Sequence, residues 1–178
     1  MTKRFGAVLV ALMLLLLAVT PTAGAGPKGT ERPFKGWATG EATFLLENPL
    51  GCPAEPAGGF GITTATDAWG NASHLGNMSL HGDHCPLLDG GIIEGTMVFF
   101  AANGDELHTT YEGTATLLPP NIGDPIYVTV YMTVDPAAST GRFVGAEGEI
   151  VLDAELVFEG IGDPAWPWAA TWTGTLSY

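Results

Sequence analysis

Residues 147–159 alternate between apolar and acidic side chains with a period of two. One parity carries Ile150, Leu152, Leu156 and Phe158, and the other carries Glu147, Glu149, Asp153, Glu155 and Glu159. Because side chains alternate across a β-strand, this pattern predicts a strand with one buried and one solvated face. Strands of this kind are typical of antiparallel sheets that pack one face on a core.

Similar short runs recur along the chain, separated by Gly, Pro, Asn and Asp. We predict strands at residues 36–46, 60–67, 71–82, 92–102, 105–117, 126–134, 147–159 and 166–178. A Trp-Gly-Asn turn at Trp69 joins the second and third strands, and Asn103-Gly104, which tolerates positive φ, joins the fourth and fifth. The sequence therefore predicts an all-β fold, an antiparallel up-and-down barrel of about eight strands, in which closure removes the exposed sheet edges.

The N-terminus has the three parts of a secretory signal peptide, which we place at residues 1–25. Thr2-Lys3-Arg4 is a short basic region, residues 8–19 are uncharged and apolar, and Ala23-Gly24-Ala25 is a small-x-small cleavage site. The alternative is an uncleaved anchor, but the apolar stretch is shorter than the about 20 residues that span a bilayer. We predict a flexible leader at 26–34, a single barrel domain at 35–178, and a secreted or periplasmic location.

The predicted mature chain is strongly acidic. The full chain has a net charge of −13, and without Lys3 and Arg4 four basic residues oppose 19 acidic ones, a net charge of −15. Arg142 is the only cation after Lys35. Because nucleic acids and anionic membrane surfaces require basic patches, this charge balance argues against both as partners.

The two cysteines, Cys52 and Cys85, are predicted to form one disulfide, as expected of an exported chain. The loop that they close predicts a stabilisation of about 3–4 kcal/mol from reduced entropy of the unfolded chain. Two free thiols are the alternative.

Several motifs carry a resemblance to a known family. They are "SHLG" at 73–76, "FFAANGDEL" from Phe99 with the Tyr111-x-Gly113 that follows, "STGRFVGAEG" at 139–148 and the terminal "GTLSY". Together they resemble small exported bacterial proteins related to the allene oxide cyclase barrel and, more distantly, to plant dirigent proteins.

The resemblance implies a calycin-like barrel, and it implies a homo-oligomer, since allene oxide cyclase and dirigent barrels associate as trimers. The plant cyclases act on a fatty-acid epoxide, and dirigent proteins steer radical coupling. The residues that match are turn glycines and core positions, so no catalytic residue is carried over to this chain.

His81, His84 and Cys85 lie within five positions, and His74 shortly precedes them. A structural zinc site needs four ligands, and a catalytic site needs three plus water. Cys85 could supply a thiolate only if it is not oxidised with Cys52. We therefore predict no metal site, and we expect no cofactor.

Strand parity separates the histidines. If residues 71–81 form one unbroken strand, His74 shares a face with Met78 and Leu80, and His81 points the opposite way. A bulge would reverse this relation, because one extra residue changes the parity. His74 is thus predicted to face the interior, either as a hydrogen-bonded core histidine or as a polar group in a ligand cavity.

The barrel interior is the predicted binding site. On the last strand the tryptophans share one parity with small residues, a mixture that suits a small tapered barrel. Eight strands leave room either for side chains alone or for one small ligand. The residues predicted to contact a ligand are His74, Met78, Tyr111, Trp168 and Trp172.

Two features are predicted to be structural. Arg142 is expected to form a bidentate bridge to a carboxylate that holds a loop against the barrel, with binding of a ligand anion as the alternative. Asn103-Gly104 is expected to be a hairpin turn. Asn71 and Asn77 begin Asn-x-Ser sequons, which matter only in a host that glycosylates.

Four functions fit these features. The first is a secreted barrel that binds a small apolar molecule in its lumen, and the second is an isomerase or cyclase on the same barrel. The third is a packed structural or surface-interaction barrel, and the fourth is an outer-membrane barrel with strands of suitable length. The absence of an identifiable catalytic set favours a protein that is not an enzyme.

Overall fold

The computed structural model describes residues 29–117, 121–160 and 165–178. The predicted signal peptide, and residues 26–28 of the predicted leader, lie outside the described residues. The elements are β1 (Arg32–Leu45), β2 (Thr63–Ala72), β3 (Gly76–Pro86), β4 (Gly91–Ala101), β5 (Glu106–Ala115), β6 (Pro125–Val134), η1 (Gly141–Phe143), β7 (Glu147–Val157) and β8 (Ala165–Ser177).

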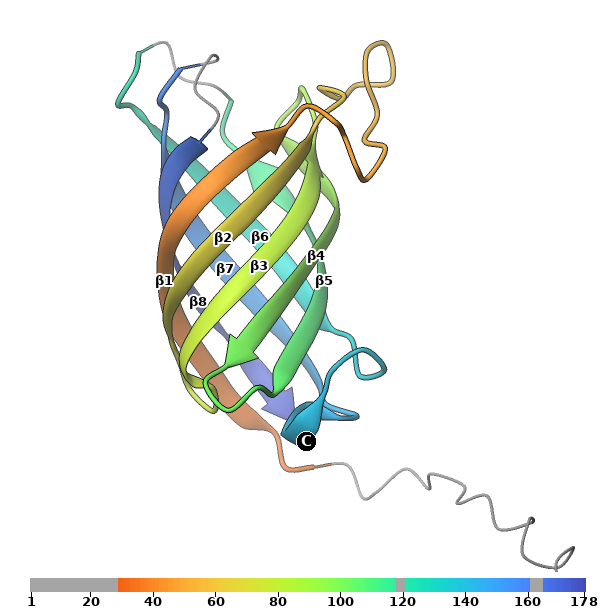
Figure 1. Cartoon of the computed structure of the whole chain (residues 1–178), viewed down its shortest axis with the longest axis vertical. Helices are drawn as coiled ribbons and strands as arrows, with labels where there is room; N and C mark the ends of the chain where they lie inside the picture. The colour runs from red at the N-terminus through yellow and green to blue at the C-terminus, as the bar shows by residue number, and fades with distance from the viewer. Residues whose placement is uncertain (1–28, 118–120, 161–164) are drawn as a thin grey trace, which may run out of the picture.

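The strands form a closed antiparallel barrel (Figure 1). Each strand pairs with the next in sequence, and β8 closes the barrel against β1 from Arg32–Leu176 to Thr43–Ala165. The predicted all-β, eight-stranded, up-and-down barrel is confirmed. We call the end with the β2–β3 and β4–β5 turns the base, and the end with the β1–β2 and β3–β4 connections the mouth.

Two predicted boundaries were wrong. β1 begins at Arg32, so the last residues of the predicted leader belong to the barrel, and Phe34 is fully buried. The predicted turn at Trp69 lies instead within β2, where Trp69 pairs with Thr39 and Ser79. Trp-Gly-Asn resembles a turn in composition, but both neighbouring strands pair with it, and such tertiary pairing overrides local preference.

The β2–β3 turn lies at residues 73–75, within the stretch predicted to be one strand. His74 and Gly76 have positive φ values of 70° and 71°, which reverse the chain there. The Ser73 hydroxyl accepts a hydrogen bond from the Lys35 amide at 2.8 Å, and this bond ties the turn to β1.

The base half of the barrel is filled by large side chains. Phe34, Phe99 and Trp172 pack together, with ring centroids 5.4–6.4 Å apart. Phe143, from the β6–β7 connection, is fully buried and packs against Tyr178 at 5.3 Å. This aromatic core closes the base.

Arg142 lies beside the β4–β5 turn at the base. Its Nε is 3.1 Å from Asp105 Oδ2, and its Nη2 donates to Asn103 Oδ1 at 3.4 Å. Asn103 in turn donates to Asp105 at 2.8 Å, and Gly104 has a φ of 86°. The guanidinium therefore contacts one carboxylate and one amide oxygen instead of forming the predicted bidentate bridge to a carboxylate. These contacts link the β6–β7 connection to the β4–β5 hairpin.

The outer face of β7 is acidic. The exposed, outward side of β7 carries Glu147, Glu149, Asp153 and Glu155. A barrel that spans a bilayer needs the opposite arrangement, an apolar outer band around a polar interior. The outward acids of β7 therefore argue against the outer-membrane alternative.

Within the described ranges, no helix has the length and apolar character needed to cross a membrane.

Candidate ligand-binding cavity

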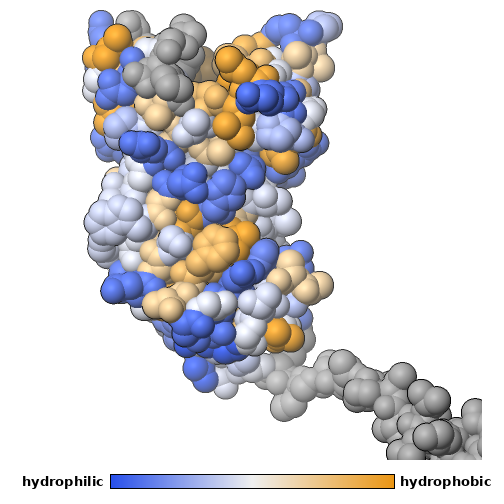
Figure 2. Space-filling view, in the orientation of Figure 1, coloured by the Kyte–Doolittle hydropathy of each residue, from blue (hydrophilic) through white to orange (hydrophobic). Residues whose placement is uncertain are grey.

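The mouth half of the barrel encloses a cavity of about 770 Å³. Figure 2 shows the corresponding end of the molecule hollowed between two raised rims, with apolar atoms along the hollow. Ligand pockets for small molecules are typically about 300–1,000 Å³ and mostly apolar. The cavity therefore has the size and lining of a small-molecule site.

Small inward side chains help to leave the cavity open. Ala42, Ala115 and Ala154 line it beside larger residues, whereas the base holds the packed rings of Phe34, Phe99 and Trp172. A barrel of eight strands has an interior just wide enough for side chains to fill, so alanines in several strands leave space.

The walls are apolar on all sides. The cavity-lining residues include Phe44, Ile62, Ile92, Met97, Ile126, Val128, Val130, Leu152, Leu156, Trp166 and Trp168. Among the described residues that line it there is no Asp, Glu, Lys or Arg. Besides the indole N–H groups of the two tryptophans, polar side-chain groups come from Thr64, Thr66, Thr116, His84 and Tyr111.

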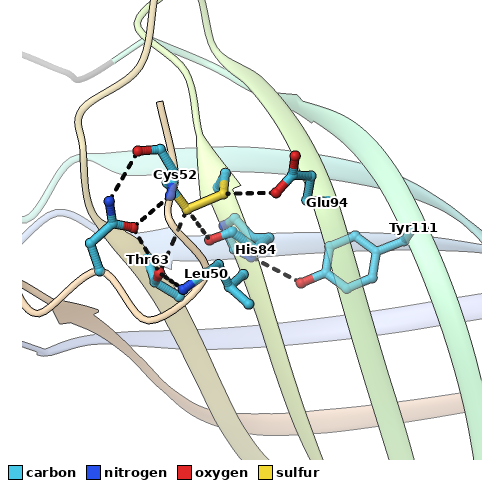
Figure 3. The surroundings of a disulfide bond; sticks show 8 residues. Leu50, Cys52, Thr63, His84, Glu94 and Tyr111 are labelled. Carbon is cyan, nitrogen blue, oxygen red and sulfur yellow. Dashed lines mark hydrogen bonds between the residues drawn. A yellow bond between two sulfur atoms is a disulfide. The ribbon is translucent and has the colours of Figure 1, made fainter. Parts of the chain in front are cut away.

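His84 and Tyr111 form a hydrogen-bonded pair in the cavity wall (Figure 3). His84 Nδ1 lies 2.9 Å from the Tyr111 hydroxyl oxygen, and the two rings meet at an angle of 64°. His84 comes from the end of β3 and Tyr111 from the middle of β5, so β4 separates them in the sheet.

A bulge in β4 allows the pair to meet. The β3–β4 and β4–β5 registers both shift around Ile93 and Glu94, and Glu94 has a φ of 54°. Beyond the bulge Gly95 faces Tyr111, and a Cβ atom at Gly95 would lie 2.4 Å from the Tyr111 ring. The missing side chain of Gly95 therefore provides the space for this ring.

Burial keeps both members of the pair neutral. Desolvation lowers the pKa of His84 to about 4, so the imidazole is uncharged at neutral pH. Desolvation, together with the Asp83 carboxylate, raises the pKa of the Tyr111 hydroxyl. The pair thus contributes hydrogen-bonding groups without charge.

Three other polar side chains of the wall are unsatisfied. Thr64 Oγ1 and the indole Nε1 atoms of Trp166 and Trp168 are buried, and none has a hydrogen-bond partner among the described residues. Thr66 differs, because its hydroxyl donates to the Gly82 carbonyl at 3.1 Å.

The disulfide Cys52–Cys85 is confirmed, with Cα atoms 5.3 Å apart (Figure 3). It joins the β1–β2 connection to β3 at the residue after His84. The Asn48 side chain also holds Cys52, accepting from its amide at 2.7 Å and donating to its carbonyl at 3.0 Å. The bond thus fixes one wall of the mouth beside the polar pair.

The residues predicted to contact a ligand divide into three groups. Tyr111 and Trp168 line the cavity. Met78 and Trp172 are buried in the hydrophobic core but are not among the lining residues.

His74 was predicted to face the interior, and this prediction was wrong. It lies in the β2–β3 turn at the base, and its Nε2 is 3.0 Å from the Pro33 carbonyl oxygen. The prediction failed because parity has meaning only within a strand, and the chain turns at residues 73–75.

His84 was missed, although the signal was present. Met78, Leu80, Gly82 and His84 share one parity, and β3 continues to Pro86. The predicted strand stopped at Gly82, which placed His84 in a turn. Gly82 instead lies within β3, where the absence of a side chain accommodates close neighbours. A Cβ atom at Gly82 would lie 3.1 Å from Met97 Cε.

His81 points outward and binds carboxylates. Its Nδ1 is 2.8 Å from Asp67 and its Nε2 is 3.3 Å from Asp83, and the hydrogen bond to Asp67 is the main cause of its raised pKa. His81 and His84 therefore lie on opposite faces of β3. Within residues 29–117, 121–160 and 165–178, no group of three or more His, Cys, Asp or Glu side chains could hold a metal ion.

Comparison of the chain with family models, with curated proteins and with solved structures finds no match in any of the three.

Proposed function

We propose that this protein is an extracytoplasmic barrel that binds a small, largely apolar and uncharged molecule in the cavity at its mouth. The observation that carries this proposal is the hollow of about 770 Å³, whose walls are apolar apart from a few uncharged polar groups. The buried Cys52–Cys85 disulfide is consistent with an oxidising compartment.

The lining favours a neutral ligand. A buried charge without an opposite charge costs several kcal/mol, and no charged side chain is present among the described lining residues. A charged group of a ligand would therefore have to remain at the mouth, in water.

A second candidate is an isomerase or cyclase on the same barrel, in keeping with the resemblance to allene oxide cyclases. The specific observation in its favour is a histidine beside a tyrosine in an apolar cavity. General bases work best with a pKa near the operating pH, and the pKa of His84 is lowered to about 4. Binding is therefore the better-supported function.

Titration with N-phenyl-1-naphthylamine, a neutral apolar dye, tests the proposal. We expect saturable binding with one site per barrel, and energy transfer from Trp166 and Trp168, which line the cavity. Ala154→Phe places a ring in the cavity, and we expect it to weaken binding by about tenfold or more.

The matched control is Val151→Phe, on the same strand but on the outer face, where Val151 is 37% exposed. It adds a similar ring without filling the cavity, so dye affinity should stay within about twofold of the wild type. An absence of saturable binding, or equal binding by the two variants, would contradict the proposal.

A further inference from the structure

The polar groups of the cavity are unbalanced between hydrogen-bond donors and acceptors. No Asp, Glu, Asn or Gln side chain occurs among the described residues that line it. The threonine and tyrosine hydroxyls of the wall can accept as well as donate, but the indoles of Trp166 and Trp168 can only donate, and their N–H groups have no acceptor among the described residues.

The His84–Tyr111 pair adds one further donor, whichever tautomer the histidine adopts. A neutral imidazole carries one N–H and a neutral tyrosine one O–H, so the pair has two polar hydrogens. Their mutual contact at 2.9 Å uses one of these, and neither side chain has another hydrogen-bond partner among the described residues. One N–H or O–H of the pair is thus always left without an acceptor from the described part of the chain.

Buried donors without acceptors are destabilising, and a ligand can satisfy them. We infer that the preferred ligand is an apolar molecule with a neutral acceptor oxygen, such as a ketone, ester or ether, which receives the unused hydrogen of the His84–Tyr111 pair. This inference rests on the proposed binding function and names the chemical class of the ligand.

Other head groups fit less well. A primary ammonium brings only donors and a charge, and the described lining residues offer it no side-chain carboxylate and no side-chain amide oxygen. A carboxylate could accept a hydrogen bond, but it would enter without a cationic partner. A pure hydrocarbon fits the walls but leaves the donors unsatisfied.

Benzophenone and 1,1-diphenylethylene form a matched pair of probes, since they differ only by a carbonyl oxygen in place of a methylene group. Their dissociation constants can be measured by displacement of the naphthylamine dye. In the wild type we expect both to bind. In the His84→Phe/Tyr111→Phe variant, the preference for the ketone over the hydrocarbon should fall by about tenfold, because the carbonyl would be buried without a donor.

Two single variants complete the design. Tyr111→Phe leaves the His84 N–H available, so it should retain the preference for the ketone. Thr109→Val removes a buried hydroxyl that is not part of the cavity lining and that donates to the Met97 carbonyl at 3.2 Å, so it should leave the preference unchanged.

An infrared measurement on the wild type gives a test that does not depend on folding of the double variant. A hydrogen bond lowers the carbonyl stretching frequency of bound benzophenone relative to benzophenone in hydrocarbon solvent. We expect this lowering in the wild-type complex.

The outcomes separate the inference from the function on which it rests. If both probes bind but the ketone preference is unchanged in the double variant, or the carbonyl frequency is not lowered, the cavity binds apolar molecules without selecting an acceptor. The inference is then wrong and the binding function stands. If neither probe nor dye binds, the binding function is wrong and the inference fails with it.

Discussion

At the scale of single residues, the same side-chain type has opposite properties on the two faces of β3. His81 is partly exposed and bonded to Asp67, which raises its pKa, whereas His84 faces the cavity beside Tyr111, and desolvation lowers its pKa to about 4. Environment, and not residue type, decides which of them is a neutral group in the cavity.

His84 makes stability depend on pH. Its pKa is about 4 when folded and 6.5 in the unfolded chain, so between these values the unfolded state binds more protons. Stability is therefore lost as the pH falls through this window, and we expect a loss of about 2 kcal/mol between pH 7 and pH 5.

Urea unfolding of the wild type and of His84→Phe at both pH values measures this loss. The variant should lack it, while the opposite contribution from His81 is common to both proteins and cancels in the comparison. An equal change of unfolding free energy in the two proteins would show that His84 is not the group responsible.

At the scale of elements, the β1–β2 connection and the β4 bulge shape the wall of the cavity. The connection is held by the disulfide, by Asn48, and by a bridge between Gly59 and Leu87 in the β3–β4 connection. The bulge at Ile93 and Glu94 changes the parity of β4. Neither the β1–β2 connection nor the β4 bulge is part of the regular antiparallel pairing that closes the barrel.

Removal of the disulfide tests the first of these features. Cys52→Ala/Cys85→Ala should lower the free energy of unfolding by about 3–4 kcal/mol, because the loop of 33 residues is no longer constrained in the unfolded chain. The β-sheet circular dichroism should be retained, since all eight strand pairings remain. Dithiothreitol should destabilise the wild type and have no effect on this variant.

Glu94 tests the second feature, because it has a positive φ of 54° and its side chain is exposed. Glycine adopts this conformation without the Cβ penalty, so Glu94→Gly should raise the free energy of unfolding by about 0.5–1 kcal/mol. Glu112→Gly, at an exposed position of β5, should lower it by about the same amount, as measured by urea unfolding. Equal effects of the two substitutions would contradict the role given to the bulge.

At the scale of the whole molecule, charge is concentrated on the outside of an apolar barrel. The chain has 19 acidic and 6 basic residues, and the described lining of the cavity has none of either kind. Mutual repulsion of exposed carboxylates opposes the compact state and is screened by salt.

Raising sodium chloride from 20 to 200 mM should therefore raise Tm by about 2 °C or more in a thermal scan. Glu149→Gln/Glu155→Gln, which removes two exposed charges from the outer face of β7, should reduce this salt effect. A lower Tm at high salt would mean that attractive ion pairs outweigh the repulsion.

Much of the fold could be predicted from local patterns. Period-two alternation located the strands to within about five residues, and the prediction of export, together with the presence of only two cysteines, predicted the disulfide. At Trp69 and Gly82, glycine and asparagine suggested a turn or a strand end inside a paired strand. At His74 the opposite error occurred, since a turn lies within a predicted strand, and β1 also begins earlier than predicted. Glycine and asparagine are compatible with both turns and paired strands, and only the neighbouring strands decide between them.

The sequence by itself determined that this chain forms a closed antiparallel barrel with an apolar interior, an acidic exterior and one disulfide, because alternation, charge and cysteine number are local or additive properties. Only the tertiary structure decided where the interior is hollow and which polar groups face the hollow. The volume left in a barrel depends on side chains from all eight strands at the same height. The contact between His84 and Tyr111 depends on a bulge in β4, the strand that lies between them. The local sequences around His84 and Tyr111 do not reveal this bulge.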